Sequence, residues 1–153
     1  MMEKYDHIDI ALIRALQRDS SLSQRALADI VGLSQNACWK RLSRLREDGL
    51  LGQSTLRLDP ARWGLNFTAF VMVRTRRHDR LWLDRFRQLV LAIPNIVDFH
   101  RIAGEYDYLL KVVTHDMKEF DGVYRQLIEQ MEFDTVTSHI VMEAIVDNRE
   151  LPI

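Results

Sequence analysis

Two short helical patterns meet at a bend in the first third of the chain, and this pair most constrains the fold. Residues 23–31 and 34–46 each place apolar side chains on one face at helical spacing. Gly32 permits the sharp bend between them, and Ser23 and Ser34 are good N-cap residues. Such a pair is the helix-turn-helix pattern, in which the second helix enters the major groove of DNA and the first crosses the backbone.

The second helix of the pair carries a basic, polar face. Residues 34–46 contain Lys40, Arg41, Arg44 and Arg46 and no acidic residue. Cys38, Leu42 and Leu45 project to the inward side, while the outward side presents residue types that hydrogen-bond base edges and phosphates. An ordinary helical hairpin with a solvated basic face is the alternative. We predict that the DNA-binding residues are Ser23, Gln24, Ser34, Gln35, Asn36, Trp39, Lys40, Arg41 and Arg44.

Different roles are expected within this set. Lys40, Arg41 and Arg44 are expected to hold phosphates, and Gln35 and Asn36 are expected to read bases. Lys40 and Arg44 are also candidates for base reading. This prediction requires that the cationic face is exposed and that carboxylates from elsewhere in the fold do not neutralise it.

A third helix completes the first module. Residues 6–19 repeat apolar side chains at helical spacing, so that three helices share one core. Residues 50–58 are partly β-branched and end at Asp59-Pro60, which predicts a strand and then a boundary. The strand pairs either within its own subunit or with a partner subunit. We expect a winged helix-turn-helix domain over residues 1–58 and a linker over residues 59–66.

Residues 67–153 have a different pattern of apolar residues, in which strand and helix spacings alternate, and this predicts a second domain. The pattern predicts strands over 67–77, 96–103, 106–114 and 136–146 and helices over 81–93 and 117–131. Gly104-Glu105 is expected to form a tight hairpin connection. The order strand, helix, strand, strand, helix, strand is the ferredoxin-like arrangement, with both helices on one face of an antiparallel sheet. The fold class is therefore expected to be α+β.

This arrangement leaves one face of the sheet uncovered. Phe70 and Met72 alternate with Ala69, Val71 and Val73, so apolar side chains occur on both faces. A second subunit is the simplest cover, through a self-complementary two-fold contact. Such a homodimer would present two reading helices to a pseudo-palindromic site on double-stranded DNA.

Charge and composition limit the remaining possibilities. Residues 1–58 hold nine Lys and Arg against seven Asp and Glu, a net of +2, while the rest of the chain has twelve against fifteen, a net of −3. DNA binding should therefore depend on placed contacts and on a partner subunit more than on bulk charge. No apolar run reaches transmembrane length and no signal peptide opens the chain, so we expect a cytoplasmic, nucleoid-associated protein. Cys38, the single cysteine, is expected to be a buried apolar residue.

The residues as a whole resemble the leucine-responsive regulatory protein and asparagine regulator (Lrp/AsnC) family of transcription factors. Three segments carry the resemblance: residues 38–49 of the reading helix, the hairpin Gly104–Leu110, and residues 141–143 of the last strand. Members often carry Thr and Pro where this chain has Asn36-Ala37, and this difference could alter the DNA site that is read. Ala37 is a better helix former than Pro, so the helix itself is still expected.

The resemblance implies a dimer that assembles into a tetramer or octamer and binds a small effector, usually an amino acid, between dimers. It places the effector site at Ala103, Gly104, Glu105, Tyr106, Asp107, Thr137, Ser138, His139 and Ile140. Asp107 could accept from the ammonium of an amino acid, and amides around Gly104 could donate to its carboxylate. From the hairpin alone, a glycine between two strands is more simply a turn. No cofactor and no metal are expected.

We therefore predict a sequence-specific, effector-responsive regulator of amino-acid metabolism and not an enzyme. A tetrapyrrole-processing enzyme is one alternative, because siroheme decarboxylases look similar in architecture and His100-Arg101 fits that idea. An effector-blind nucleoid-organising protein is the other. His100, His115 and His139 are too widely spaced for a metal motif. Trp39 is expected either at the sugar-phosphate edge or in the groove between helices, and the arginines of residues 74–80 are expected to form a solvated rim.

Overall fold

The computed structural model describes residues 4–153, which divide into two compact units. Among the described residues, the helical unit comprises 4–57 together with 146–153, and the sheet unit comprises 58–145. The last eight residues therefore lie with the first unit, although the sequence pattern grouped them with the second. Arg14 and Gln17 hold this terminal segment, through Arg14 Nε to Ile153 O at 2.6 Å and Leu151 N to Gln17 Oε1 at 2.8 Å.

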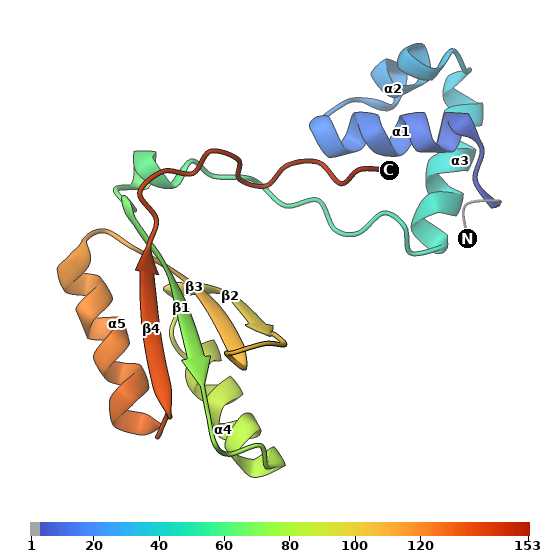
Figure 1. Ribbon diagram of the computed structural model, residues 1–153. Helices are drawn as coiled ribbons and strands as arrows, with labels where there is room; N and C mark the ends of the chain where they lie inside the picture. The colour runs from blue at the N-terminus through green and yellow to red at the C-terminus, as the bar shows by residue number, and fades with distance from the viewer. Residues whose placement is uncertain (1–3) are drawn as a thin grey trace. The chain divides into compact units, whose positions relative to one another are not determined.

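Three helices build the first unit, as predicted: α1 (His7–Arg18), α2 (Gln24–Val31) and α3 (Gln35–Glu47) (Figure 1). Their inward faces form one apolar core of Leu12, Ala15, Leu27, Ala28, Cys38 and Leu42. The predicted bend is also present. Gly32 ends α2 in the left-handed conformation, with a φ of 68°, which is unfavourable for residues that carry a side chain. The helix-turn-helix geometry is thus present in the folded chain.

Serine side chains begin both helices of the pair. The Ser23 hydroxyl accepts from Ala26 N–H, and the Ser34 hydroxyl accepts from Ala37 N–H at 3.3 Å. Each bond satisfies an amide that the helix itself leaves free. The sequence therefore determines where the reading helix begins.

Replacing Ser34 with alanine is expected to destabilise the protein by about 1 kcal/mol, because an N-cap acceptor is removed. Ser34→Gly is the matched comparison and should cost only a few tenths of that amount, since glycine leaves the first-turn amides open to water. Urea unfolding followed by helical circular dichroism measures both values. Equal losses for the two variants would show that the hydroxyl contributes nothing.

The predicted strand over residues 50–58 is wrong for the single chain. These residues form no strand, residues 52–58 are all exposed, and Leu56 is 85% exposed. A strand requires a neighbouring strand to accept and donate its backbone hydrogen bonds. Within residues 4–153 the segment has no such ladder, and Arg57 instead donates its side chain to Asn148 O at 2.8 Å. Pairing within the subunit is thereby excluded for this conformation.

The sheet unit has the predicted ferredoxin-like order, with a short 3₁₀ helix (Pro60–Trp63) before it. Its elements are β1 (Phe67–Arg74), α4 (Arg80–Leu91), β2 (Ile96–Arg101), β3 (Tyr108–Thr114), α5 (Met117–Gln130) and β4 (Thr135–Ile140). The four antiparallel strands lie in the order β2-β3-β1-β4, which Figure 1 shows with β1 between β3 and β4.

Both helices cover the same face of this sheet. Ala69, Val71 and Val73 of β1 are buried in one core with α4 residues Trp82 and Phe86 and with side chains of α5. On the opposite face Phe70 is 36% exposed and Met72 is half-buried. The uncovered apolar face predicted from the alternation in β1 is therefore present.

The observed strands are shorter than predicted. The last strand, predicted over residues 136–146, ends at Ile140, one residue before Val141 N–H donates to Thr68 O of β1. The connection between β2 and β3 spans residues 102–107 and is not a two-residue turn. Asp107 N–H donates to Val73 O of β1, and β3 itself begins at Tyr108.

Candidate nucleic-acid interface and effector site

The polar side of α3 is exposed. Cys38, Leu42 and Leu45 are buried beneath the helix, which leaves Gln35, Asn36 and Lys40 on its outward side. Trp39 is 49% exposed, so it does not fill the groove between helices and is available at the surface. Ser23, Gln24 and Ser34 are exposed at the first turns of α2 and α3. The outward side can thus present hydrogen-bonding groups and one aromatic ring to a groove of DNA.

Two of the predicted phosphate-binding arginines form ion pairs within the unit. Arg41 Nη1 lies 2.8 Å from Asp6 Oδ2 and 2.9 Å from Asp9 Oδ1. Arg44 Nη2 lies 2.5 Å from Asp9 Oδ2. The condition that no carboxylate neutralises the cationic face therefore fails for both arginines. Their first function is to tie α3 to the start of α1.

Asp9 is the centre of this network, and its side chain is only 1% exposed. One carboxylate oxygen also accepts from Asp6 N–H, which completes a capping box at the start of α1. The backbone N–H of Asp9 and then the Arg41 guanidinium lower the pKa of Asp6 to about 2. The Asp6 carboxylate is therefore charged at neutral pH, and together with the Asp9 side chain it holds Arg41 in place.

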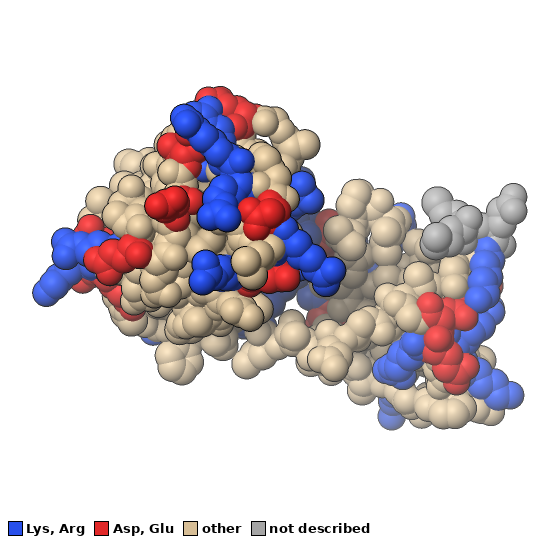
Figure 2. All heavy atoms as spheres, turned by 90° about the horizontal axis from the view of Figure 1, so that it is seen from below, with Lys and Arg blue, Asp and Glu red and all other residues tan. Residues whose placement is uncertain are grey.

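Lys40 is left as a cation without an ion-pair partner among the described residues. It is exposed on the outward side of α3. Figure 2 shows red acidic side chains between blue basic side chains on the face of the helical unit that it presents. The surface is thus mixed in sign, and attraction of phosphates depends on individual side chains.

The loop predicted to bind an effector is exposed at its tip. Ala103, Gly104 and Glu105 are exposed, while Tyr106 and Asp107 are half-buried. Gly104 has a φ of 134°, a conformation that residues with a side chain rarely adopt. Asp107 Oδ2 accepts from Thr75 N–H at 2.8 Å, so Asp107 fixes the loop against the end of β1. One oxygen of the Asp107 carboxylate is therefore already engaged by a backbone hydrogen bond within the fold.

The structure brings this loop to the predicted residues of β4. Tyr106 Oη lies 3.1 Å from Thr137 Oγ1, although 31 residues separate them. Thr137 and His139 pair with Met72 and Phe70 of β1 and therefore project from the uncovered face. Ser138 and Ile140 belong to the opposite face, because they pair with core residues of β1. The two halves of the predicted site meet, but only alternate residues of β4 share its face.

The histidines, the single cysteine and the expectations about metals and membrane spans can be compared directly with the structure. His100 and His139 lie on β2 and β4, the two edge strands of the sheet, and His115 bonds Glu119 at 2.7 Å. Within residues 4–153, no three His, Cys, Asp or Glu side chains gather as a metal site requires. Cys38 is 0% exposed and burial raises its pKa, which confirms its apolar role. No described helix is both long and apolar enough to cross a membrane.

Sequence reasoning missed Asp9 as a functional position. Its signal is present in the chain, because Asp9 stands three residues before the buried Leu12 on the face that packs inward. An acidic residue at such a position requires a basic partner. The arginines of α3 are the partners, and they lie more than 30 residues away in sequence.

Comparison with known proteins identifies the family of this architecture. Residues 68–151 match the Lrp/AsnC ligand binding domain, and residues 5–51 match a winged helix-turn-helix DNA-binding domain. The chain belongs to the Lrp/AsnC family. Curated relatives include the Escherichia coli DNA-binding transcriptional activator DecR, 44% identical over 97% of this chain and 98% of that protein. The glutamate uptake regulatory protein of Zymomonas mobilis is 36% identical over 100% and 93%.

Solved Lrp/AsnC structures agree with this assignment. An AsnC family transcriptional regulator from Agrobacterium tumefaciens has a TM-score of 0.91 at 39% identity and covers 97% of both chains. A transcriptional regulator from Neisseria meningitidis, solved as a complex with L-Met, has a TM-score of 0.91 at 28% identity over 97% of this chain and 96% of that one. The α+β fold and the regulator class predicted from the sequence are confirmed, and the decarboxylase and nucleoid-organiser alternatives are disfavoured.

Proposed function

We propose that this Lrp/AsnC protein reads DNA through the outward side of α3 and that an amino acid modulates its binding. The observation that carries the proposal is the exposed polar side of α3 on a helix-turn-helix core. Gln35 and Asn36 read bases, Lys40 binds a phosphate, and Trp39 contacts the sugar-phosphate edge. At the N-termini of α2 and α3, the side chains of Ser23, Gln24 and Ser34 bind the sugar-phosphate backbone of the DNA. Arg41 and Arg44 orient α3 and offer their remaining N–H groups to phosphates.

The proposed effector site is the surface between residues 103–107 and the uncovered face of β4. Tyr106, Thr137 and His139 contribute hydrogen-bonding side chains on one face, and the open backbone near Gly104 contributes donors for a carboxylate. The L-Met complex of the Neisseria meningitidis regulator supports an amino acid as the ligand. Asp107 contributes to the ammonium end and also holds the loop, so its two functions are linked.

A homodimer is the proposed basic assembly, with further association into a tetramer or octamer. The uncovered face supports this, since α4 and α5 both pack on the opposite face of the sheet and leave Phe70 and Met72 partly exposed. Met142 and Ile145, which follow β4, are 94% and 86% exposed. The residues over 50–58 have backbone groups available to pair across the dimer. Two reading helices would then address a pseudo-palindromic operator.

An effector at such a junction acts through a difference in affinity between assembly states. Its expected signature is a change in oligomer size or DNA affinity at a fixed protein concentration. The protein then works in the cytoplasm at the nucleoid, as a binding protein and not as an enzyme. Fluorescence anisotropy with promoter duplexes and unrelated duplexes tests this. Equal affinity for all duplexes, with tight uptake of a tetrapyrrole, would overturn the proposal.

A thermal-shift screen against the common amino acids is expected to give at least one stabilising ligand, because a ligand selective for the folded form raises its stability. Tyr106→Phe should weaken that ligand by about fivefold, the effect of losing one ordinary hydrogen bond. Asp121→Asn, on the outward side of α5, serves as the control and should leave the shift unchanged. A wild-type response in Tyr106→Phe and Thr137→Val would remove the site assignment.

A further inference from the structure

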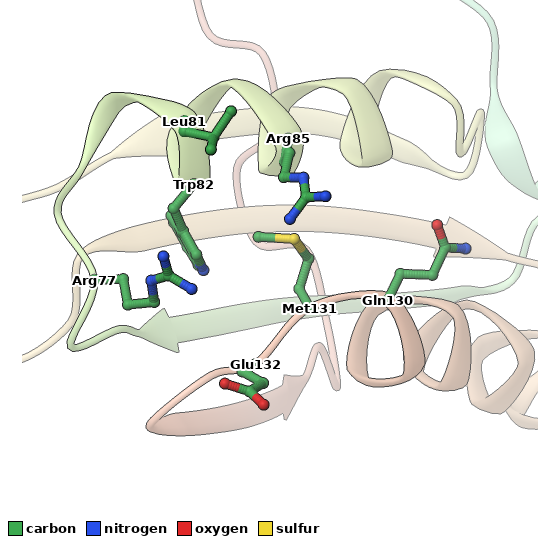
Figure 3. Close-up of a pocket in the computed structure, with 7 residues that line it drawn as sticks. All are labelled: Arg77, Leu81, Trp82, Arg85, Gln130, Met131 and Glu132. Atoms are coloured by element: carbon green, nitrogen blue, oxygen red, sulfur yellow. The ribbon is translucent and has the colours of Figure 1, made fainter.

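The sheet unit contains a cavity that is open to solvent, between the start of α4 and the end of α5. Its volume is about 230 Å³, room for a molecule of amino-acid size, since one water in the liquid takes roughly 30 Å³. The residues that carry its chemistry are Arg77, Leu81, Trp82, Arg85, Met131 and Glu132 (Figure 3). None of them belongs to the effector set on the loop and β4, so the cavity is a separate site.

A buried donor without an acceptor lies in the wall of this cavity. Trp82 is only 4% exposed, and its indole Nε1 has no hydrogen-bond partner among the described residues. In Figure 3 the indole nitrogen of Trp82 is drawn beside the Arg77 guanidinium. Packing against Phe86 and Tyr108 at centroid distances of 5.1 and 5.9 Å holds the ring in this orientation. Folded proteins leave few buried N–H groups unpaired, which indicates that an acceptor completes the site.

Two arginines place further donors beside the same edge. Arg85 forms no ion pair with any described residue, and its guanidinium points from α4 into the space toward Met131 (Figure 3). Among the described residues, the Arg77 guanidinium makes one long contact, from Nε to Asp79 Oδ2 at 3.4 Å. Two guanidinium groups and an indole N–H donate hydrogen bonds and accept none. The ligand must therefore present an anionic group with several acceptor atoms, as a carboxylate does.

The rest of the wall is apolar, with one acid. Leu81, the Trp82 ring and the Met131 thioether provide apolar contact for a short carbon chain. Glu132 is the single acidic side chain of the lining, which leaves two positive charges against one negative. This balance favours a small anion with an organic body over a neutral molecule or an inorganic cation.

We propose that this cavity binds a small organic carboxylate of amino-acid size and net charge −1. The carboxylate lies on Arg85, Arg77 and the Trp82 N–H, and the carbon chain lies against Leu81 and Met131. An acidic amino acid and a 2-oxo acid share this chemistry. They differ in the ammonium group, which only the amino acid can place near Glu132.

Tryptophan fluorescence can report this site alone. The chain has three tryptophans, and the Trp39→Phe, Trp63→Phe background leaves Trp82 as the sole tryptophan. Titration with L-aspartate and with 2-oxobutyrate is expected to change the emission of Trp82 saturably for one or both. Inorganic phosphate is the anion without a carbon body and is expected to bind at least tenfold more weakly. Phosphate binding of equal strength would overturn the carboxylate assignment.

Arg85→Leu is expected to raise the dissociation constant roughly tenfold or more, because a charge-assisted hydrogen bond is removed. Arg87→Leu is the matched control on the same helix, since Arg87 pairs with Asp84 and does not line the cavity. Arg87→Leu should bind the carboxylate with the same dissociation constant as the Trp39→Phe, Trp63→Phe protein. An equal loss in both variants, or no loss in Arg85→Leu, would overturn the assignment of Arg85, and the absence of any saturable change would overturn the site.

Two further variants separate the possible sources of the signal. Glu132→Gln should weaken L-aspartate and leave 2-oxobutyrate unchanged if the ammonium contacts Glu132, and loss of both ligands to the same degree would contradict the proposed orientation. Tyr106→Phe should leave Trp82 emission titrations unaffected. A Trp82 response that disappears in Tyr106→Phe would show that the ligand occupies the loop site and would overturn the separate cavity site, without affecting the proposed regulator function.

Discussion

Asp9→Asn is expected to lower the free energy of unfolding by about 2 to 3 kcal/mol, because it removes the buried charge of an ion-pair network, which leaves Arg44 without its carboxylate partner and Arg41 with Asp6 alone. Asp9 is 1% exposed and contacts Arg41 at 2.9 Å and Arg44 at 2.5 Å. Breaking a fully buried pair costs more than this, but Arg41 and Arg44 are 27% and 45% exposed and can regain water. Asparagine keeps the size of the side chain and an oxygen for the Asp6 N–H, so the change isolates the charge.

Urea unfolding followed by circular dichroism measures this effect. Asp6→Asn is the matched control, because it also removes one carboxylate that contacts Arg41 and because asparagine is an equally good N-cap. Asp6 lies at the surface, so its replacement should cost far less than that of Asp9. Equal stability of wild type and Asp9→Asn would mean that the network does not hold α3 on α1.

Lys40→Ala and Asn36→Ala are expected to change DNA binding in two different ways. Removing Lys40 should reduce the slope of log affinity against log salt by about 0.9 for each phosphate that the lysine neutralises, because fewer counterions are released. Asn36→Ala should reduce discrimination between the correct and an altered base pair by about 1 to 3 kcal/mol, and it should leave the salt slope unchanged. This division rests on the exposure of both side chains and on Lys40 having no ion pair within residues 4–153.

Fluorescence anisotropy over a series of salt concentrations separates these effects. Lys118→Ala is the control for Lys40, since it removes the same exposed charge from α5 of the sheet unit. Its salt slope should match wild type. If Lys40→Ala keeps the full slope and Asn36→Ala keeps full selectivity while both variants remain folded, α3 is not the reading element.

Local signals made the helical unit predictable from sequence. Ser23 and Ser34 cap α2 and α3 at the positions expected, and Gly32 adopts the left-handed conformation that the bend requires. Caps and glycine conformations depend on neighbouring residues only, so a single chain reveals them. The same holds for the alternation in β1, which predicted the uncovered face correctly.

Features that depend on distant residues were not predictable. The ends of β4 and the absence of a strand at 50–58 follow from where a neighbouring strand is available among residues 4–153. Arg41 and Arg44 looked like free cations because Asp9 lies on another helix. The cavity at Trp82 is formed by the start of α4 and the end of α5, whose lining residues lie about 50 positions apart in the chain, and no motif marks it.

The buried position of Cys38 has a practical consequence for spectroscopy. Because the only thiol of the chain is buried and its pKa is raised, we expect maleimide reagents not to react with Cys38 while the protein is folded. A dye or spin label can then be attached to a cysteine introduced at a surface site such as position 118, with the native cysteine left in place. Distances between labelled copies would follow the spacing of the subunits directly, with and without an amino acid present.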